Sequence, residues 1–510
     1  MNNLKEKMSL HPVMTFLILT AITMVVSGIL NILDFSQYAY SINSTTLEYS
    51  MHLSSVENMF SIAGLRYIFS ETVANFVSFT PFSTLIIVLI GFGVMEKSGF
   101  LKTAISFITK KMKKNTVTFL IIFVSVISSV MGDISYVIML PLSALIFKYG
   151  KRNPLIGVVA SFAGLTCGQG LSFIFTSMDS SLLSESLLAA RVIDVTYRMA
   201  SISGIFIMAV AVILISVVLT NITEKITASR FGKYELEEEI EEKPMTKREL
   251  RGLLFAIFGG TIYLIIFLYN IIPGLPFSGN LLDNSQILYI DKLFSYNSFF
   301  SNGFVFIVTI FFIILGLFYG LGARTIKDHK DFVSSLGYSL DGVGETIVLI
   351  FVTSLFISVF KNTYIGETVV AALASIFQNT NFQGVALIIL LFIVSMISTL
   401  VLPGSISKWE ILSPVVIPVF MNAGMTPEFA QVIFRFGESV TMGLTPIMAY
   451  FVIYLAILNK NTKDKKSVNI LSAIKYQIPY AILTGLVLIA LLILWYIIGL
   501  PLGINGSTVL

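Results

Sequence analysis

Long apolar runs, separated by short charged patches, dominate the amino-acid sequence. Each run is about 20 to 30 residues long, and a helix needs about 20 apolar residues to cross the hydrocarbon core of a bilayer. This pattern favours membrane-spanning helices over the alternating strands of a membrane barrel. Of the 510 residues, 55% are hydrophobic and 12% are charged, whereas soluble domains carry about 25% charged residues. The sequence therefore predicts an all-α integral membrane protein.

Composition and missing motifs exclude several classes of function. The net charge is only +4, and the basic residues gather in predicted loops, so no nucleic-acid surface is expected. Cys167 is the single cysteine, which excludes an internal disulfide and a cysteine metal cage. The chain has no phosphate-binding loop, no G-x-S-x-G elbow and no H-E-x-x-H pair. We therefore expect no enzyme, no cofactor and no assigned metal site, and transport would draw on an ion gradient or on the gradient of the solute.

The basic patches orient the chain, because cytoplasmic loops are enriched in Lys and Arg. They predict a cytoplasmic N-terminus, an external C-terminus, and external segments at 34–61 and 273–302. Residues 224–251 are expected to form a cytoplasmic linker between two membrane halves, 1–223 and 252–510. The patches that define the cytoplasmic side are Lys5 and Lys7; Lys110, Lys111, Lys113 and Lys114; Lys148, Lys151 and Arg152; Arg324, Lys327 and Lys330; and Lys460, Lys463, Lys465 and Lys466.

Two stretches are expected to enter the membrane and return to the side from which they came. The first hairpin, 115–147, has cytoplasmic markers at both ends and turns at M-G-D-I-S. The second, 383–425, turns at L-P-G-S-I-S-K and has both ends outside. Because the two hairpins are oppositely oriented, their turns are predicted to approach each other near the middle of the membrane.

A long, interrupted helix follows each hairpin. The first, 154–183, is broken at T-C-G-Q-G, and the second, 427–458, is broken at T-M-G-L-T-P. Two units of hairpin plus broken helix in opposite orientation are typical of secondary transporters built from inverted repeats. The predicted fold has about nine transmembrane helices plus two re-entrant hairpins, arranged as inverted repeats.

Interruptions in a membrane helix also predict where a solute binds. Glycine and proline free backbone amides and carbonyls, which hydrocarbon tolerates only where they face protein or a water-filled cavity. The polar residues near the breaks and turns are therefore candidates for the site. The candidates for substrate binding are Gln169, Ser172, Ser405, Ser407, Trp409, Arg435 and Thr441; those for ion or proton coupling are Asp133, Asp179 and Glu438; and Ser135, Thr166, Thr176, Lys408, Ser439 and Thr445 complete the set.

Each candidate also has a structural interpretation. Ser and Thr in membrane helices often bond their own backbone or a neighbouring helix. Arg435 and Glu438 are three residues apart on one helical face, so a local ion pair explains them as well as a ligand does. Lys408 and Trp409 have the character of an interfacial anchor.

Four motifs resemble those of the AbgT family, the aminobenzoyl-glutamate transporters. They are G-D-I-S-Y-V-I-M-L-P-L at the first hairpin, A-G-L-T-C-G-Q-G-L-S-F-I-F-T-S-M-D at the first broken helix, S-I-S-K-W-E-I-L-S-P at the second hairpin, and R-F-G-E-S-V-T-M-G-L-T-P at the second broken helix. The resemblance covers nearly the whole chain. It implies a homodimer of nine-helix, two-hairpin subunits.

The resemblance also assigns particular residues. Asp179 matches the acidic residue at the end of the first broken helix, Trp409 the hairpin tryptophan, and Arg435 the arginine that opens the last motif. Glu438 stands where the family usually has Asp. Ser172 and Met442 each replace an asparagine, and a methionine cannot donate and accept hydrogen bonds as an amide does, so we expect the substrate to differ.

The sequence thus predicts a secondary active transporter in the cytoplasmic membrane. It is expected to move a small carboxylate-bearing aromatic or peptide-like solute, with Na⁺ or H⁺ as the coupling ion. Helix N-termini would hold the carboxylate, and freed carbonyls with Asp179 or Glu438 would take the ion. The alternatives are a proton-driven efflux pump for folate precursors or sulfonamide-type drugs and, as a different class, a passive channel.

Overall fold

The computed structural model describes residues 10–109, 112–171, 174–199, 202–232, 245–295, 297–462 and 467–510. Within these ranges, eight helical segments are long and apolar enough to cross a membrane. They are Pro12–Ile32, Ile62–Ser98, Lys114–Met131, Ile205–Phe231, Lys247–Ile271, Phe299–Ala323, Gly344–Asn362 and Ile470–Ile498. The prediction of a helical membrane protein is confirmed.

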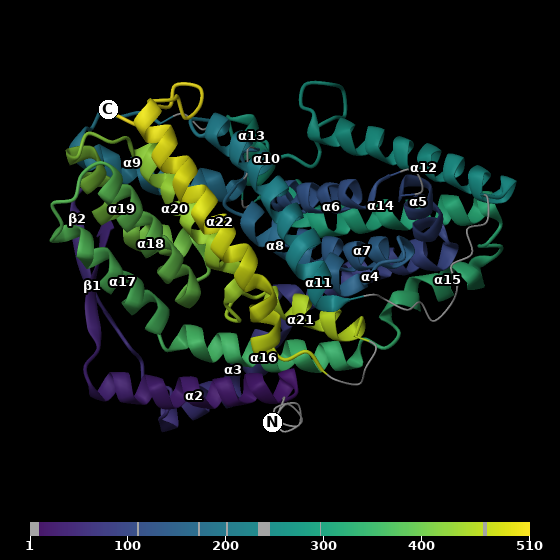
Figure 1. Ribbon diagram of the computed structural model, residues 1–510, viewed down its shortest axis with the longest axis horizontal. Coiled ribbons are helices and arrows are strands. Elements are labelled where there is room, and N and C mark those ends of the chain that lie inside the picture. Colours follow the sequence, from purple (N-terminus) through teal and green to yellow (C-terminus); the bar gives the residue numbers. More distant parts are fainter. Residues whose placement is uncertain are drawn as a thin grey trace.

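The helices of the first half alternate between long spans and shorter pieces (Figure 1). Their bounds are α2 Pro12–Ile32, α3 Ile62–Val77, α4 Thr80–Ser98, α5 Phe100–Thr109, α6 Lys114–Ser128, η1 Ser129–Met131, α7 Ile134–Tyr149, α8 Pro154–Gly168, α9 Ser177–Ile193, α10 Ile205–Ile222, η2 Thr223–Thr227 and α11 Ala228–Phe231. Helical structure therefore continues to Phe231, into the segment predicted as a linker. Residues 233–244 of that linker lie outside the described residues.

The second half follows the same alternation. Its bounds are α12 Lys247–Ile271, α13 Tyr289–Phe294, α14 Phe299–Ala323, α15 His329–Gly337, η3 Tyr338–Leu340, α16 Gly344–Asn362, α17 Ile365–Gln378, α18 Val385–Val401, α19 Ser405–Asn422, α20 Pro427–Thr441, η4 Met442–Leu444, α21 Phe451–Lys460 and α22 Ile470–Ile498. Many apolar side chains of α12 are exposed, among them Leu254, Ile257 and Ile265. This is the surface that lipid is expected to cover.

Two strands depart from the expectation of an entirely helical chain. Strands β1 (Ser36–Ile42) and β2 (Tyr49–Ser55) pair antiparallel, with Ser36 opposite Ser55 and Ile42 opposite Tyr49. The charge pattern of the sequence predicted only an external loop for this segment. The hairpin packs on α17 and α19 and stands at the left edge of Figure 1.

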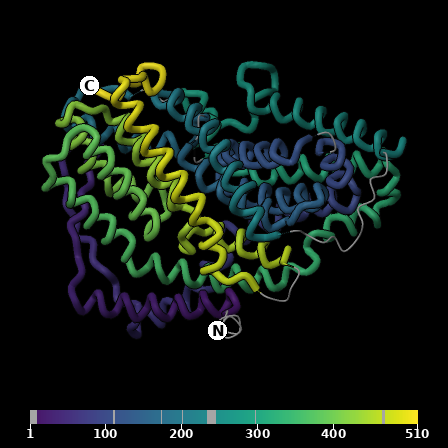
Figure 2. Tube along the Cα trace, viewed as in Figure 1, coloured from purple at the N-terminus to yellow at the C-terminus, as the bar shows by residue number. Residues whose placement is uncertain are grey.

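The helices form two groups that lie side by side in the long direction of the molecule (Figures 1 and 2). In one group α12 packs on α14 and α14 on α4; in the other, α18 packs on α20, α19 on α9 and α17 on α19. The hairpin turns and helix interruptions predicted from the sequence coincide with real ends of helices. The α6–α7 turn contains Gly132 with φ of +61°, a conformation that favours glycine, and Pro403 ends α18 because it disfavours helical backbone at Leu402.

The two interrupted helices touch where the first one breaks. A Cβ atom added to Gly170, just beyond α8, would overlap Ser439 Oγ and the carbonyl oxygen of Arg435 on α20. One residue earlier in the same break, Gln169 ends the hydrogen-bonded ladder of α8. Glycine at 170 therefore sets how closely the break of α8 approaches α20.

We predict that Gly170→Ala destabilises the protein by about 1–3 kcal/mol, the usual cost of overpacking a tight contact. Unfolding of the purified protein in detergent measures the change. Gly337→Ala is the matched control, because no atom of the described residues beyond its own stretch of helix lies within 4 Å of the added Cβ, and its effect should stay within about 0.5 kcal/mol. Equal stability of the two variants would contradict this contact.

Candidate functional site

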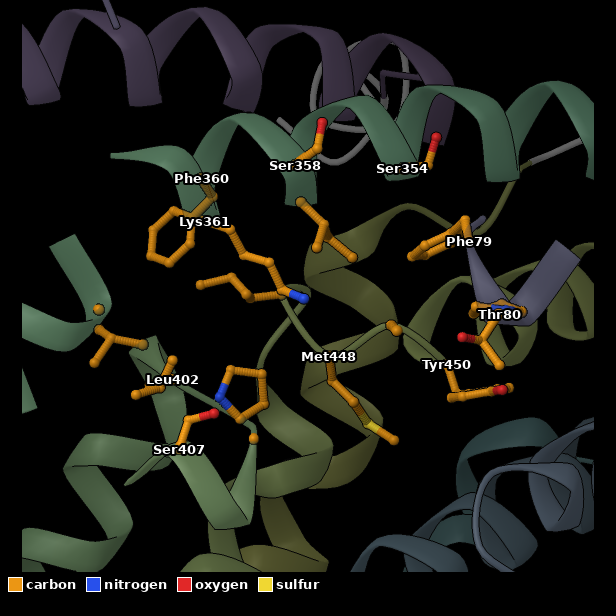
Figure 3. Close-up of a pocket in the computed structure, with 18 of the residues that line it drawn as sticks. Phe79, Thr80, Ser354, Ser358, Phe360, Lys361, Leu402, Ser407, Met448 and Tyr450 are labelled. Atoms are coloured by element: carbon orange, nitrogen blue, oxygen red, sulfur yellow. The ribbon is translucent and has the colours of Figure 1, made fainter. Parts of the chain in front are cut away.

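Two cavities meet at the hairpin turns. The larger, of about 580 Å³, is lined by the α6–α7 turn, the α8–α9 interruption, the N-terminus of α19 and residues of α14. The other, of about 430 Å³, is lined by the end of α16, the start of α17, the α3–α4 connection and the segment after η4 (Figure 3). Asp133, Gln169, Gly404 and Ser407 border both cavities. Both predicted turns therefore contribute to the lining of both cavities.

The polar side chains at this junction make only some of their possible hydrogen bonds to the described residues. Asp133 is exposed at the N-cap position of α7, where its side chain makes no capping hydrogen bond. Ser407 is also exposed, in the first turn of α19. The hydroxyl of Tyr136 donates to Gln169 Oε1 at 3.2 Å, which holds the amide at the junction. A carboxylate, an amide and a hydroxyl thus face the cavities.

Asp179 and Arg435 form a buried ion pair between α9 and α20. Asp179 also belongs to the capping box of α9, accepting from the backbone N–H and hydroxyl of Thr176 at 2.8 and 2.7 Å. The second guanidinium nitrogen of Arg435 donates to the backbone carbonyl of Gln169 at 3.0 Å. These contacts join the break of the first helix to the second interrupted helix.

Glu438 pairs with Lys408 rather than with Arg435. Lys408 Nζ lies 3.1 Å from Glu438 Oε2, both side chains are fully buried, and Ser405 Oγ donates to Glu438 Oε1 at 3.0 Å. Lys408 also donates to Thr399 Oγ1 at 2.6 Å. The local Arg435–Glu438 pair considered from the spacing is wrong for the described residues, since each side chain has a partner on another helix.

Several other candidates serve packing in this structure. Trp409 is fully buried, donates to Ser186 Oγ at 2.8 Å and packs on Phe434, so it is not an interfacial anchor. Thr441 and Thr445 donate to the carbonyl oxygens of Met396 and Leu400 on α18, both at 2.8 Å.

Three more hydroxyls bond backbone carbonyls close in sequence. Thr166 donates to Phe162 at 3.0 Å, Ser439 to Arg435 at 2.8 Å, and Ser135 to Gly132 at 2.6 Å. Ser172 lies outside the described residues.

Part of the cavity lining lies away from the breaks and turns predicted from the sequence. Lys361, at the end of α16, and Glu367, in the first turn of α17, both line the 430 Å³ cavity. Tyr450 and Thr80 line its other side (Figure 3). The available signal was the presence of Lys361 and Glu367 beside an apolar run, since ionisable groups in membrane segments mark functional sites. Among the described residues, no group of three or more His, Cys, Asp or Glu side chains could hold a metal ion.

Apolar spanning helices around cavities, which hairpin turns and helix interruptions border with polar side chains, define a membrane transport protein. The chain belongs to the AbgT putative transporter family, whose family model matches residues 4–510.

Similar proteins extend over nearly the whole chain. The p-aminobenzoyl-glutamate transport protein of Escherichia coli is 25% identical over 495 residues, covering 97% of this chain and 93% of the relative. The YdaH transporter of Alcanivorax borkumensis is 24% identical, with a TM-score of 0.49 over 97% of this chain and 100% of that structure. The antimetabolite efflux pump MtrF of Neisseria gonorrhoeae is 26% identical, with a TM-score of 0.49 over 98% of both chains.

The buried Lys408–Glu438 pair makes a quantitative prediction. Lys408→Met should destabilise the protein by about 3–5 kcal/mol, because it leaves a buried carboxylate without its cation. Adding Glu438→Gln should recover most of that loss, and unfolding in detergent measures both. As a control, Glu224→Gln alters the separate Arg152–Glu224 pair at the Lys114 end of α6, so its effect and that of Lys408→Met should add within about 0.5 kcal/mol. If Arg435→Met, rather than Lys408→Met, recovered the stability lost in Glu438→Gln, the Lys408–Glu438 assignment would be contradicted. The local Arg435–Glu438 pair would then be supported.

Proposed function

We propose that the protein is a secondary active transporter that couples a cation to the movement of a small carboxylate-bearing aromatic or peptide-like solute. The observation that carries this proposal is the sharing of Asp133, Gln169 and Ser407 by two cavities. A solute held at this junction contacts both chambers. Movement of the two hairpin turns would then open one chamber as the other closes, which is how alternating access works at a fixed site.

The substrate class is supported by the polar groups and by the relatives. The E. coli relative carries the name of p-aminobenzoyl-glutamate, a solute that combines an aromatic amine, an amide and carboxylates. Gln169 can both donate to and accept from such groups, and Ser407 can do the same. The apolar lining next to them, which includes Phe79 and Ile357, suits an aromatic ring.

We assign cation coupling first to Asp133. Its side chain is exposed at the junction of the cavities, whereas Asp179 and Glu438 are each engaged by a buried cation. Asp133 has no ion-pair partner within the described ranges, so its carboxylate is available to Na⁺ or H⁺. Asp179 and Glu438 would contribute to coupling only if their ion pairs opened during the transport cycle.

The same site can work in either direction, because the imposed gradients determine the direction of net flux. Import of the solute and proton-driven export of folate precursors or sulfonamide-type drugs therefore share one structural basis. A passive channel is the alternative of a different class. We place the transporter in the cytoplasmic membrane as a homodimer, with the N-terminus inside and the C-terminus outside, on the basis of the basic patches and the family resemblance.

Reconstituted vesicles test the proposal. With labelled 4-aminobenzoate or p-aminobenzoyl-glutamate and an imposed Na⁺ or H⁺ gradient, we expect one of the cations to drive accumulation above the external concentration. Asp133→Asn should abolish this accumulation while the protein remains folded. Asp341→Asn is the control, since Asp341 is exposed next to η3 and lines neither cavity.

The outcomes separate the alternatives. A channel would equilibrate the solute without concentrating it under any gradient. Export would appear as gradient-driven loss of preloaded solute. Normal accumulation by Asp133→Asn would remove Asp133 from coupling, and a lack of transport of both compounds in both directions would overturn the proposed substrate class.

A further inference from the structure

The side chain of Lys361 extends into the 430 Å³ cavity. Lys361 is the penultimate residue of α16, immediately before the sharp corner at which Tyr364 has a φ of +55° and α17 begins. Figure 3 shows its amine at the centre of the cavity, on the side of Leu402 and Ser407. The residue is exposed to this space.

Among the described residues, Lys361 differs from the other cations near the site because it has no anionic partner. Arg435 pairs with Asp179, and Lys408 pairs with Glu438. In the part of the chain that the structure describes, Lys361 makes no ion pair within 4 Å and no side-chain hydrogen bond. It is also the one cation among the described residues that line this cavity.

Helix electrostatics alone do not account for this side chain. A lysine in the last turn of α16 complements the negative end of the helix dipole. That role needs the charge near the end of the helix, and a lysine pointing to solvent would fulfil it. The amine instead points into a chamber whose wall includes Phe79, Ile357 and Phe360.

The other charged side chains of the cavity indicate how the amine of Lys361 affects the binding of a charged ligand. Asp133 and Glu367 also line this chamber, so without Lys361 the chamber would carry only negative side chains and would repel a carboxylate. Lys361 adds a positive charge to the chamber, and this charge attracts a carboxylate. Elsewhere in the lining, Asp133 and Gln169 offer acceptors for an amine or amide.

We propose that Lys361 is a substrate-binding residue that selects ligands bearing a carboxylate. The carboxylate lies against the amine of Lys361, the aromatic ring lies between the apolar walls, and the hydrogen-bond donor of the ligand faces the junction. This assignment rests on the proposed function for the class of ligand. Binding and transport are therefore measured separately.

A thiol reporter measures binding without transport. The single native cysteine is buried, and Ser78 is exposed in the lining of the 430 Å³ cavity, so Cys167→Ser with Ser78→Cys leaves one reactive thiol in the cavity. Labelling by a neutral maleimide is followed at increasing 4-aminobenzoate or 4-aminobenzamide, which differ in charge at one end. We expect 4-aminobenzoate to protect the thiol at about tenfold or more lower concentration, since a charge-assisted hydrogen bond contributes about 1.5–3 kcal/mol.

The preference should depend on the charge at position 361. Lys361→Met should equalise the two compounds or reverse their order, because Asp133 and Glu367 then dominate the chamber. Lys361→Arg should retain the preference for 4-aminobenzoate. Lys102→Met, a control on α5 that lines neither cavity, should behave as the parent.

Three results would overturn the assignment: no protection by either compound in the parent, equal protection by both, or an unchanged preference in Lys361→Met that elutes as a folded protein. Protection that depends on Lys361 without any transport in vesicles would leave the binding site intact and refute the proposed function. Transport that is indifferent to Lys361→Met would refute only the role of Lys361.

Discussion

The bridge made by Arg435 is the interaction on which the centre of this protein depends. Hydrocarbon cannot satisfy the backbone groups that a broken helix releases, and the break after α8 releases the carbonyl of Gln169. Arg435 donates to that carbonyl and pairs with Asp179, which in turn caps α9 through Thr176. One side chain therefore ties both pieces of the first interrupted helix to the second. The cost of burying its charge is offset because both of its contacts are charge-assisted or satisfy a released group.

A second buried ion pair has the same structural role in the second hairpin. Lys408 and Glu438 hold α19 against α20, with Ser405 as a further donor. Because these two pairs engage four of the charged residues near the middle of the protein, the charges that face the cavities are different ones. Asp133 lies at the junction and Lys361 in the chamber beside it. We therefore propose two roles for the charged residues. The ion-paired ones hold the helices together, and the ones that face the cavities bind the ion and the solute.

Much of the fold could be predicted because its signals are local. Runs of apolar residues long enough to span a bilayer, glycine and proline at the breaks, and the alternation of charge between loops are all legible in a short window of sequence. The β1–β2 hairpin was missed because its residues are polar as well as apolar and its packing on α17 and α19 is non-local. Among the site residues, Asp133, Gln169 and Ser407 were found beside predicted breaks and turns, whereas Lys361 and Glu367 sit at the corner between α16 and α17, where no break was predicted.

The sequence by itself determined that this chain is a helical membrane protein with two hairpin turns and two interrupted helices, because hydrophobic length and backbone hydrogen bonding constrain each segment separately. Only the tertiary structure decided which charges meet. Spacing of three residues suggested that Arg435 pairs with Glu438, yet Arg435 reaches Asp179 across 256 positions of chain and Glu438 reaches Lys408 on α19. The physical reason is that a buried charge pairs with the partner that packing brings within reach, and packing depends on how all the helices come together.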